Sequence, residues 1–453
     1  MVILIALVIV VILMVVAASK FNVHPFLSLL LAGIVMGFVG GLGKTEILKT
    51  LTDGFGKTLG SIGIIIAFGT IIGAYLEKSG GAMTLANWVI KVIGAKRSVL
   101  AMNLTGFIVC IPVYCDSGFI ILSSLNKAIS KKSKIPLVTL GVALAAGLFA
   151  THVFVPPTPG PLAATAALDA DLGLVILLGI LVAIPVALVG KFWGEYIGRR
   201  VTEATAAQNA AQPITDKSLA GKEGKPSPTN LPSARISFAP IVVPIILIAL
   251  KSIGSYPTHP FGTGTFADFI DFIGNPVIAL FIGVALAFPL KPKGIIETHS
   301  NWVGAGLEQA GVIILITGAG GAFGAILRAT GIGDFIGSSF ADLDLGLLLP
   351  FIIAAVLKTA QGSSTVAIIT TAAIIAPILE SFGLDSSMGR ALSVLAIGAG
   401  SMTVSHINDS YFWVVAQFTE MDTPTALKSQ TISTLIQGLA GIAIIIVLGW
   451  VAI

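Results

Sequence analysis

Long apolar runs separated by short polar segments dominate the chain. A helix needs about 20 apolar residues to cross the hydrocarbon core of a bilayer, and ten runs approach that length. The first run begins at Val2 with no Lys or Arg before it, so we interpret it as a membrane helix rather than a secretory signal. The ten predicted transmembrane helices are 2–18, 23–42, 59–76, 136–157, 172–193, 238–254, 272–290, 309–327, 390–407 and 432–452.

Two further apolar stretches, 99–126 and 346–380, have polar residues at their centres. Each is too long for one crossing, yet neither has a hydrophilic loop between its two halves. This pattern predicts two re-entrant hairpins, which enter the membrane and leave it on the same side.

The only long hydrophilic segment, 199–237, is rich in Ala, Gln, Lys, Ser and Pro and predicts a flexible cytoplasmic linker. It separates residues 1–198 from residues 238–453, and short sequences recur in the two halves. GTIIGAYLEKSG at 69–80 resembles GGAFGAILRATG at 320–331, Ser117 pairs with Ser363, and His152 pairs with His406 at similar offsets. The order of these matches favours a duplication.

Each half would contain five crossings and one hairpin. Because five is odd, the second half would be inserted upside down, as in many secondary transporters. The predicted fold is therefore an all-α polytopic membrane protein. It has two inverted repeats, each with five transmembrane helices and one re-entrant hairpin, and its broken helices meet at a central site.

Composition agrees with a membrane protein, since 55% of the residues are hydrophobic and 11% are charged, against about 25% in soluble domains. Lys and Arg concentrate in the linker and in loops on the side that it would share. Cytoplasmic loops carry such an excess, so both termini are expected outside a bacterial plasma (inner) membrane, and no nucleic-acid partner is indicated. The two Cys residues form neither a disulfide framework nor a metal site.

The predicted hairpin tips carry the first two candidate binding motifs. A helix that restarts at such a tip directs free N–H groups and a positive dipole end toward the cavity, where they suit a carboxylate, and hydroxyl groups suit a polyol. The alternative is that these small polar residues only cap helices or aid packing. The candidates are Asp116, Ser117 and Gly118 at the first tip, and Gln361, Gly362, Ser363, Ser364 and Thr365 at the second.

Two further motifs follow the hairpins, one in each half. Residues 151–161, THVFVPPTPGP, contain too many prolines for a continuous helix, and 405–410 read SHINDS. Both are expected to be unwound ends of helices that line the site, which brings in Thr158 and Asn408 as binding candidates.

Ionisable residues within membrane segments are functional candidates. Asp116, His152, His406 and Asp409 are the candidate proton carriers, with Asp116 favoured because it lies at a hairpin tip. Lys358 is a possible counter-charge for an anionic substrate, although a structural ion pair is equally compatible with the sequence. His152 is also compatible with a hydrogen-bonded helix end, and Asp409 with a solvated carboxylate at the membrane boundary.

The sequence contains no Walker A loop, no His-Glu-x-x-His motif and no Cys pairs with zinc spacing, so neither an enzyme nor a cofactor is predicted. An intramembrane hydrolase would need a nucleophile beside a base, and no such arrangement is indicated. A channel would need charged rings or a carbonyl filter, which are not evident.

The segments HVFVPPTPGP, GNPVIALFIG, GAGGAFGAIL, GSSTVAIITTA and GAGSMTVSHINDSYFW resemble those of the gluconate permeases, which are gluconate:proton symporters of the ion transporter superfamily. The resemblance covers residues from about 23 to the C-terminus. It implies import of gluconate or a related sugar acid with a proton, opposed hairpins, and a homodimer with a scaffold and a transport domain. Asp116-Ser117-Gly118 and Gly362-Ser363-Ser364-Thr365 depart from the family's usual tip sequences and add hydroxyl groups, which makes a shorter acid such as glycerate an alternative substrate. A carrier of D-serine and a sodium-coupled carboxylate symporter are further alternatives.

Overall fold

The computed structural model describes residues 2–21, 23–94, 97–209, 231–254, 260–262, 264–292, 296–331, 345–407 and 409–452. Within these ranges every regular element is a helix, and there is no strand. Five helices are long and apolar enough to cross a membrane, or up to seven if each of two bent pairs is one span. The protein is thus a multi-pass membrane protein, as the apolar pattern predicts.

In the first half, every predicted apolar run is helical. The helices are α1 (Val2–Lys20), α2 (Pro25–Val39), α3 (Lys44–Lys78), α4 (Gly81–Ile93), α5 (Ser98–Val109), α6 (Cys115–Ser133), α7 (Leu137–Phe154), α8 (Pro159–Ala167) and α9 (Leu172–Asn209). Three differences from the prediction stand out: α3 begins well before residue 59, α4 is an additional apolar helix, and α9 continues through 199–209. Most of the predicted linker, 210–230, lies outside the described residues.

The second half has a similar series. Its helices are α10 (Ala234–Gly254), α11 (Thr265–Ile273), α12 (Pro276–Ala287), α13 (His299–Ala329), α15 (Leu348–Gln361), α16 (Ser364–Ile375), α17 (Ser387–Met402), α18 (Ser410–Phe418), α19 (Thr423–Ala426) and α20 (Ile432–Ala452). A π-helical turn, Leu427–Thr431, joins α19 to α20. The short helix α11 was not predicted separately.

Glycines allow the central helices to touch. A Cβ at Gly147 of α7 would overlap the carbonyl of Asn103 on α5, and a Cβ at Gly321 of α13 would overlap Thr58 of α3. Small residues at such crossings bring backbones together, which favours association between helices in lipid. Among the described residues, the pairs α3–α13, α7–α9 and α5–α7 are the most extensively packed.

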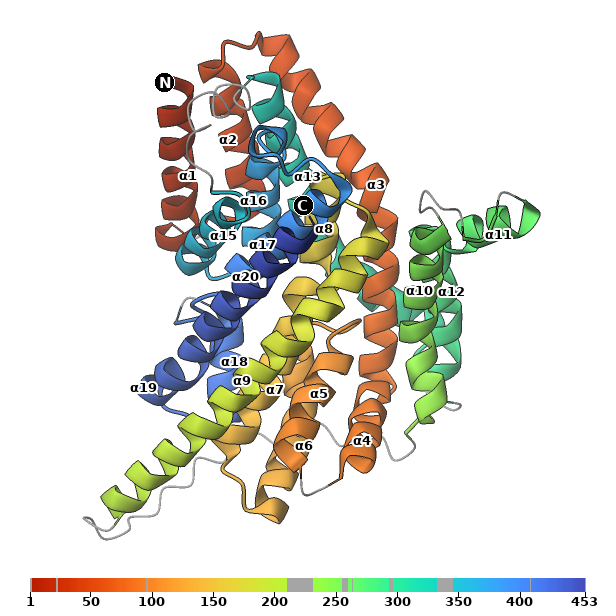
Figure 1. Cartoon of the computed structure of the whole chain (residues 1–453), viewed down its shortest axis with the longest axis vertical. Helices are drawn as coiled ribbons and strands as arrows, with labels where there is room; N and C mark the ends of the chain where they lie inside the picture. The colour runs from red at the N-terminus through yellow and green to blue at the C-terminus, as the bar shows by residue number, and fades with distance from the viewer. Residues whose placement is uncertain are drawn as a thin grey trace.

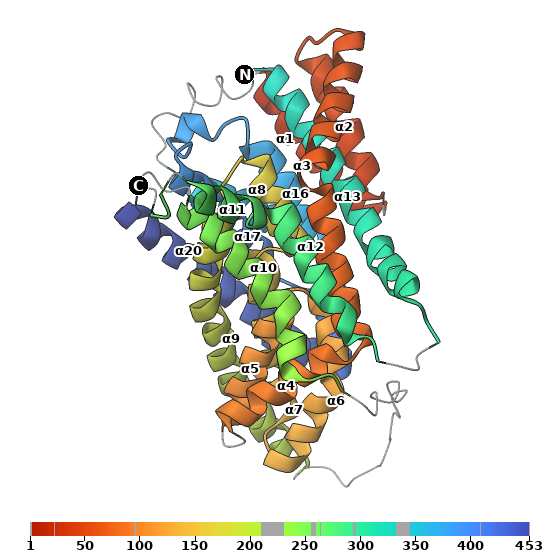
Figure 2. The same cartoon turned by 90° about the vertical axis from the view of Figure 1, so that its right-hand side faces the viewer.

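The two stretches predicted as hairpins each contain two helices separated by a break, α5–α6 and α15–α16. Figure 1 shows α5 and α6 in the lower half of the molecule and α15 and α16 in the upper half, with both chain ends in the upper half. Figure 2, turned by 90°, gives the same heights for α5, α6 and α16. The two units thus lie in opposite halves of the molecule.

Candidate functional site

Four helix interruptions each coincide with a motif identified in the sequence. The chain leaves helical geometry between α5 and α6, between α7 and α8, between α15 and α16, and between α17 and α18. Pro156 and Pro157 occupy the α7–α8 interruption, where they can neither donate a helical hydrogen bond nor fit the preceding turn. Gly362 ends α15 with φ +79°, a left-handed conformation that favours glycine.

A buried ion pair joins two of these interruptions. Lys358 of α15 donates from Nζ to Asp409 Oδ2 at 2.6 Å and to the carbonyl of Gly362 at 2.8 Å. The side chains of Lys358 and Asp409 are 0% and 6% exposed. The ammonium group is therefore already engaged by this chain, which favours the structural interpretation of Lys358 over that of a free substrate counter-charge.

Asp409 has several additional partners. Its Oδ1 accepts a hydrogen bond from the backbone N–H of Tyr411 at 3.0 Å, and Ser405 Oγ donates to Oδ2. Ser405 is held in turn by α20 and the π-helical turn, because Thr431 donates to its carbonyl and its N–H donates to Thr434. The carboxylate is thus enclosed, in contrast to the solvated boundary position considered from the sequence.

The first hairpin tip borders the same carboxylate. Asp116 lies in the first turn of α6, close enough to Asp409 for their charges to interact, and its side chain bonds to Ser410. His152, in the last turn of α7, lies near both Asp409 and Lys358 and stacks on Phe149. Both hairpin tips and both motifs that follow them therefore meet around Asp409.

Several polar atoms at this junction are buried without a protein hydrogen-bond partner. They are Asp116 Oδ1, His152 Nδ1, Tyr114 Oη and Gln361 Oε1. Buried polar groups are nearly always hydrogen-bonded in native proteins. Unpaired buried atoms also occur elsewhere in the described residues, but these four come from both hairpin tips and α7, so they are the groups that a ligand at this junction could bond. Both oxygens of Asp409 are already hydrogen-bonded within the protein, so Asp409 holds the fold, whereas the four unpaired atoms are available to a ligand.

The remaining candidates have different local roles. Ser363 caps α16 by accepting from the N–H of Val366, and Ser364 and Thr365 follow in its first turn. Ser117 lies in the first turn of α6, whereas Gly118 packs on Leu148 of α7, so its missing side chain serves helix packing. Asn408 lies outside the described residues.

Thr158 and His406 belong to the other two interruptions. Thr158 is buried at the start of α8 and donates to the carbonyl of Val155 at 2.7 Å. His406 Nε2 lies 2.8 Å from the carbonyl of Thr359 and is the donor of that hydrogen bond, which joins the α17–α18 interruption to the end of α15.

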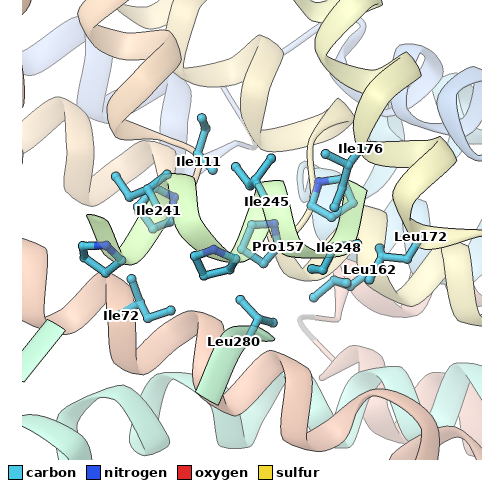
Figure 3. A pocket seen from close by; sticks show the side chains of 14 residues that line it. Ile72, Ile111, Pro157, Leu162, Leu172, Ile176, Ile241, Ile245, Ile248 and Leu280 are labelled. Atoms are coloured by element: carbon cyan, nitrogen blue, oxygen red, sulfur yellow. The ribbon is translucent and has the colours of Figure 1, made fainter. Parts of the chain in front are cut away.

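A separate pocket lies between α10, α3 and the α7–α8 interruption (Figure 3). Its volume is about 20 Å³, which is room for about one water molecule. Only Ile, Leu and Pro side chains line it, including Ile72, Ile111 and Pro157. Nothing in it can hydrogen-bond a polar ligand through a side chain, so the polar junction around Asp409 remains the candidate site.

Sequence reasoning did not single out Tyr114, Ser405, Thr431 or Thr434. Tyr114 was visible as an aromatic residue inside the first tip motif, one position before α6 begins. Thr434 lies within the predicted transmembrane helix 432–452 and Thr431 lies directly before it, and their contacts with Ser405 span more than 25 residues. No local pattern could have revealed those contacts.

Comparison with known proteins identifies relatives along almost the whole chain. The family model described as "GntP family permease" matches residues 1–451. A gluconate permease of Pseudomonas aeruginosa is 34% identical over 97% of this chain and 95% of its own length. The inner membrane permease YgbN of Escherichia coli is 35% identical, covering 96% and 95%. The Gnt-II system L-idonate transporter of Escherichia coli is 34% identical, covering 93% and 94%.

A solved structure shares the fold. The YdaH transporter of Alcanivorax borkumensis, whose crystal structure is described as having an unusual topology, aligns with a TM-score of 0.64 over 94% of this chain and 99% of its own. The sequence identity is 16%, so this likeness concerns the fold alone.

Proposed function

Because the chain belongs to the GntP family of permeases and is not an enzyme, we propose that it is a secondary active transporter that imports gluconate or a related small sugar acid together with a proton. The observation that carries this proposal is the junction around Asp409, where both hairpin tips present buried polar atoms without partners. Relatives named for gluconate and L-idonate support an acid of this kind.

The substrate carboxylate would bind at the start of α16 and of α6. The first N–H groups of a helix have no intrahelical acceptor and carry the positive end of the helix dipole. Ser363, Ser364 and Thr365 begin α16, and Ser117 lies in the first turn of α6. Lys358, already engaged by Asp409, would contribute only through its charge.

The hydroxyl groups of a sugar acid would bond to the unpaired side chains. Tyr114 and Gln361 each offer an unpaired oxygen, and His152 offers Nδ1. A hydroxyl group can donate and accept, so it suits all three. Thr158 and Asn408 stay predicted contacts from the α7–α8 and α17–α18 interruptions.

Proton coupling is proposed for Asp116. Among the four sequence candidates, Asp409 is engaged by Lys358 and His406 by a carbonyl, whereas one oxygen of Asp116 and one nitrogen of His152 have no partner. Asp116 lies near a second carboxylate, Asp409. An incoming substrate carboxylate would add a third negative charge, and protonation of Asp116 would relieve the repulsion.

We also propose an inverted repeat, with the linker in the cytoplasm and both termini outside the inner membrane. The hairpin units lie in opposite halves of the molecule, and both chain ends lie in the upper half (Figure 1), which supports this arrangement. Single cysteines at exposed Asp53 and half-buried Lys127, in a variant without Cys110 and Cys115, should react with impermeant reagents from outside and from inside, respectively. Labelling of both positions from the same side would contradict it.

The substrate is tested by uptake of labelled gluconate into proteoliposomes that have an acidic exterior. Uptake should exceed that of protein-free liposomes and should be inhibited by unlabelled gluconate and L-idonate. Stronger inhibition by glycerate or D-serine would favour these alternative substrates over gluconate.

A homodimer is also proposed, and a monomeric mass in lipid nanodiscs would contradict it.

A further inference from the structure

The Lys358–Asp409 pair lies where two elements that are distant in sequence meet. Lys358 belongs to the last turn of α15, and Asp409 is the N-cap residue of α18. Lys358 also donates a hydrogen bond to the carbonyl of Gly362, the residue at the bend of the second hairpin. One ammonium group therefore holds the hairpin bend and the α17–α18 interruption together.

A second contact joins the same two elements. His406 Nε2 donates to the carbonyl of Thr359, the residue after Lys358. The Asp409 carboxylate also accepts hydrogen bonds from the Ser405 hydroxyl and from the N–H of Tyr411. The N–H of Ser405 in turn donates to Thr434 of α20. The bonded series therefore runs from the hairpin bend through Asp409 to α20.

The first half has no charged counterpart at these positions. At the offsets set by Ser117 with Ser363 and by His152 with His406, Lys358 corresponds to Pro112 and Asp409 to Val155. The only carboxylate at the first tip, Asp116, has an unpaired oxygen. The two halves thus differ: an ion pair fixes the second hairpin, and the described residues contain no equivalent ion pair at the first.

We propose that Lys358 and Asp409 are positioning residues that tether the second hairpin tip to the α17–α18 interruption, so that these elements move as one body during transport. In this role Lys358 sets the position of Gly362 and the start of α16 and does not bind the substrate carboxylate directly. Of the measurements that test this tether, only the uptake kinetics rest on the proposed function.

The tether is tested with Lys358→Gln, Asp409→Asn and the double variant Lys358→Gln/Asp409→Asn in nanodiscs. Each single variant leaves one charge buried without its partner, whereas the double variant has a neutral hydrogen-bonding pair. Amide hydrogen exchange at 359–366 and at 403–407 should rise together by about tenfold or more in each single variant and return to within about threefold of the wild type in the double variant.

The exposed pair Lys127–Glu420 provides the matched control, since its atoms are 2.7 Å apart but its side chains are 39% and 67% exposed. Lys127→Gln/Glu420→Gln should leave exchange in both segments unchanged, because exposed ion pairs contribute little. Unchanged exchange in the Lys358 and Asp409 single variants, or a rise in only one segment, would overturn the tether. These results do not depend on which substrate is carried.

Transport kinetics separate a tether from direct substrate binding. The double variant should recover uptake relative to both single variants, with a KM within about threefold of the wild type, whereas loss of a direct contact to a carboxylate would raise the KM by about tenfold or more. A double variant with such a KM, or one as inactive as Lys358→Gln, would overturn the proposed role of Lys358. A wild-type protein that carries no sugar acid would contradict the proposed function and leave the exchange result standing.

Discussion

Asp116→Asn is expected to abolish uphill accumulation of the substrate while leaving exchange of substrate across the membrane measurable. The membrane potential, negative inside, opposes entry of an anion by about 2.3 kcal/mol per charge at 100 mV, so accumulation requires a co-transported cation. Asn preserves the size of the side chain and its capacity to accept a hydrogen bond, but it cannot take up and release a proton. Coupling, rather than substrate binding, should therefore be lost.

The measurement compares accumulation ratios with counterflow exchange in the same proteoliposomes. Asp53→Asn serves as the matched control, since Asp53 is an exposed carboxylate on α3 and should tolerate the change. Full accumulation by Asp116→Asn would exclude Asp116 as the proton carrier and direct attention to His152, the other candidate with an unpaired atom. Loss of exchange as well as accumulation would indicate that Asp116 mainly binds substrate.

Gly362→Val is expected to eliminate uptake. Gly362 is buried with φ +79°, a conformation that is strongly unfavourable for a β-branched residue. The same residue supplies the carbonyl that binds Lys358 and precedes Ser363, which caps α16. A shift of this backbone would disturb the ion pair and the proposed carboxylate site together, and a buried charge that loses its partner costs about 3–5 kcal/mol.

Gly383→Val is the matched control for backbone strain. Gly383 has φ +65° and is exposed, with nothing within 4 Å of an added Cβ. Both variants therefore place valine in a left-handed conformation, but only Gly362→Val affects the site. Comparable uptake by the two variants, at equal amounts of folded protein in size-exclusion chromatography, would show that Gly362 has no special role in transport.

The apolar runs predicted the helices well because burial in lipid demands a long apolar surface and internally satisfied backbone. The breaks between helices were also predictable, because Pro156, Pro157 and the polar tip residues stand within apolar stretches. The ends of α3 and α9 were missed because hydropathy detects only the part of a helix that lies in the membrane core. Both helices continue into polar sequence, at 44–58 and 199–209.

The site was predicted as a set of segments rather than as a network. Asp116, Lys358, His152 and Asp409 were named from their chemistry, and the structure brings them together. The bonds between these residues depend on packing between helices that are distant in sequence. The sequence could therefore offer a structural ion pair only as one interpretation of Lys358, without naming Asp409 as its partner. For the same reason, the sequence did not reveal that a Cβ at Gly118, one of the predicted substrate contacts, would meet Leu148 of α7.

Proton movement driven by substrate tests the central proposal most directly. Proteoliposomes with a pH-sensitive dye inside, equal pH on both sides and the potential clamped at zero receive gluconate from outside. Symport predicts that the lumen becomes acidic, to the same extent in sodium and in potassium buffer, and that neither Asp116→Asn proteoliposomes nor protein-free liposomes respond. Gluconate entry without a change in lumenal pH, or entry that requires sodium, would contradict the proposal.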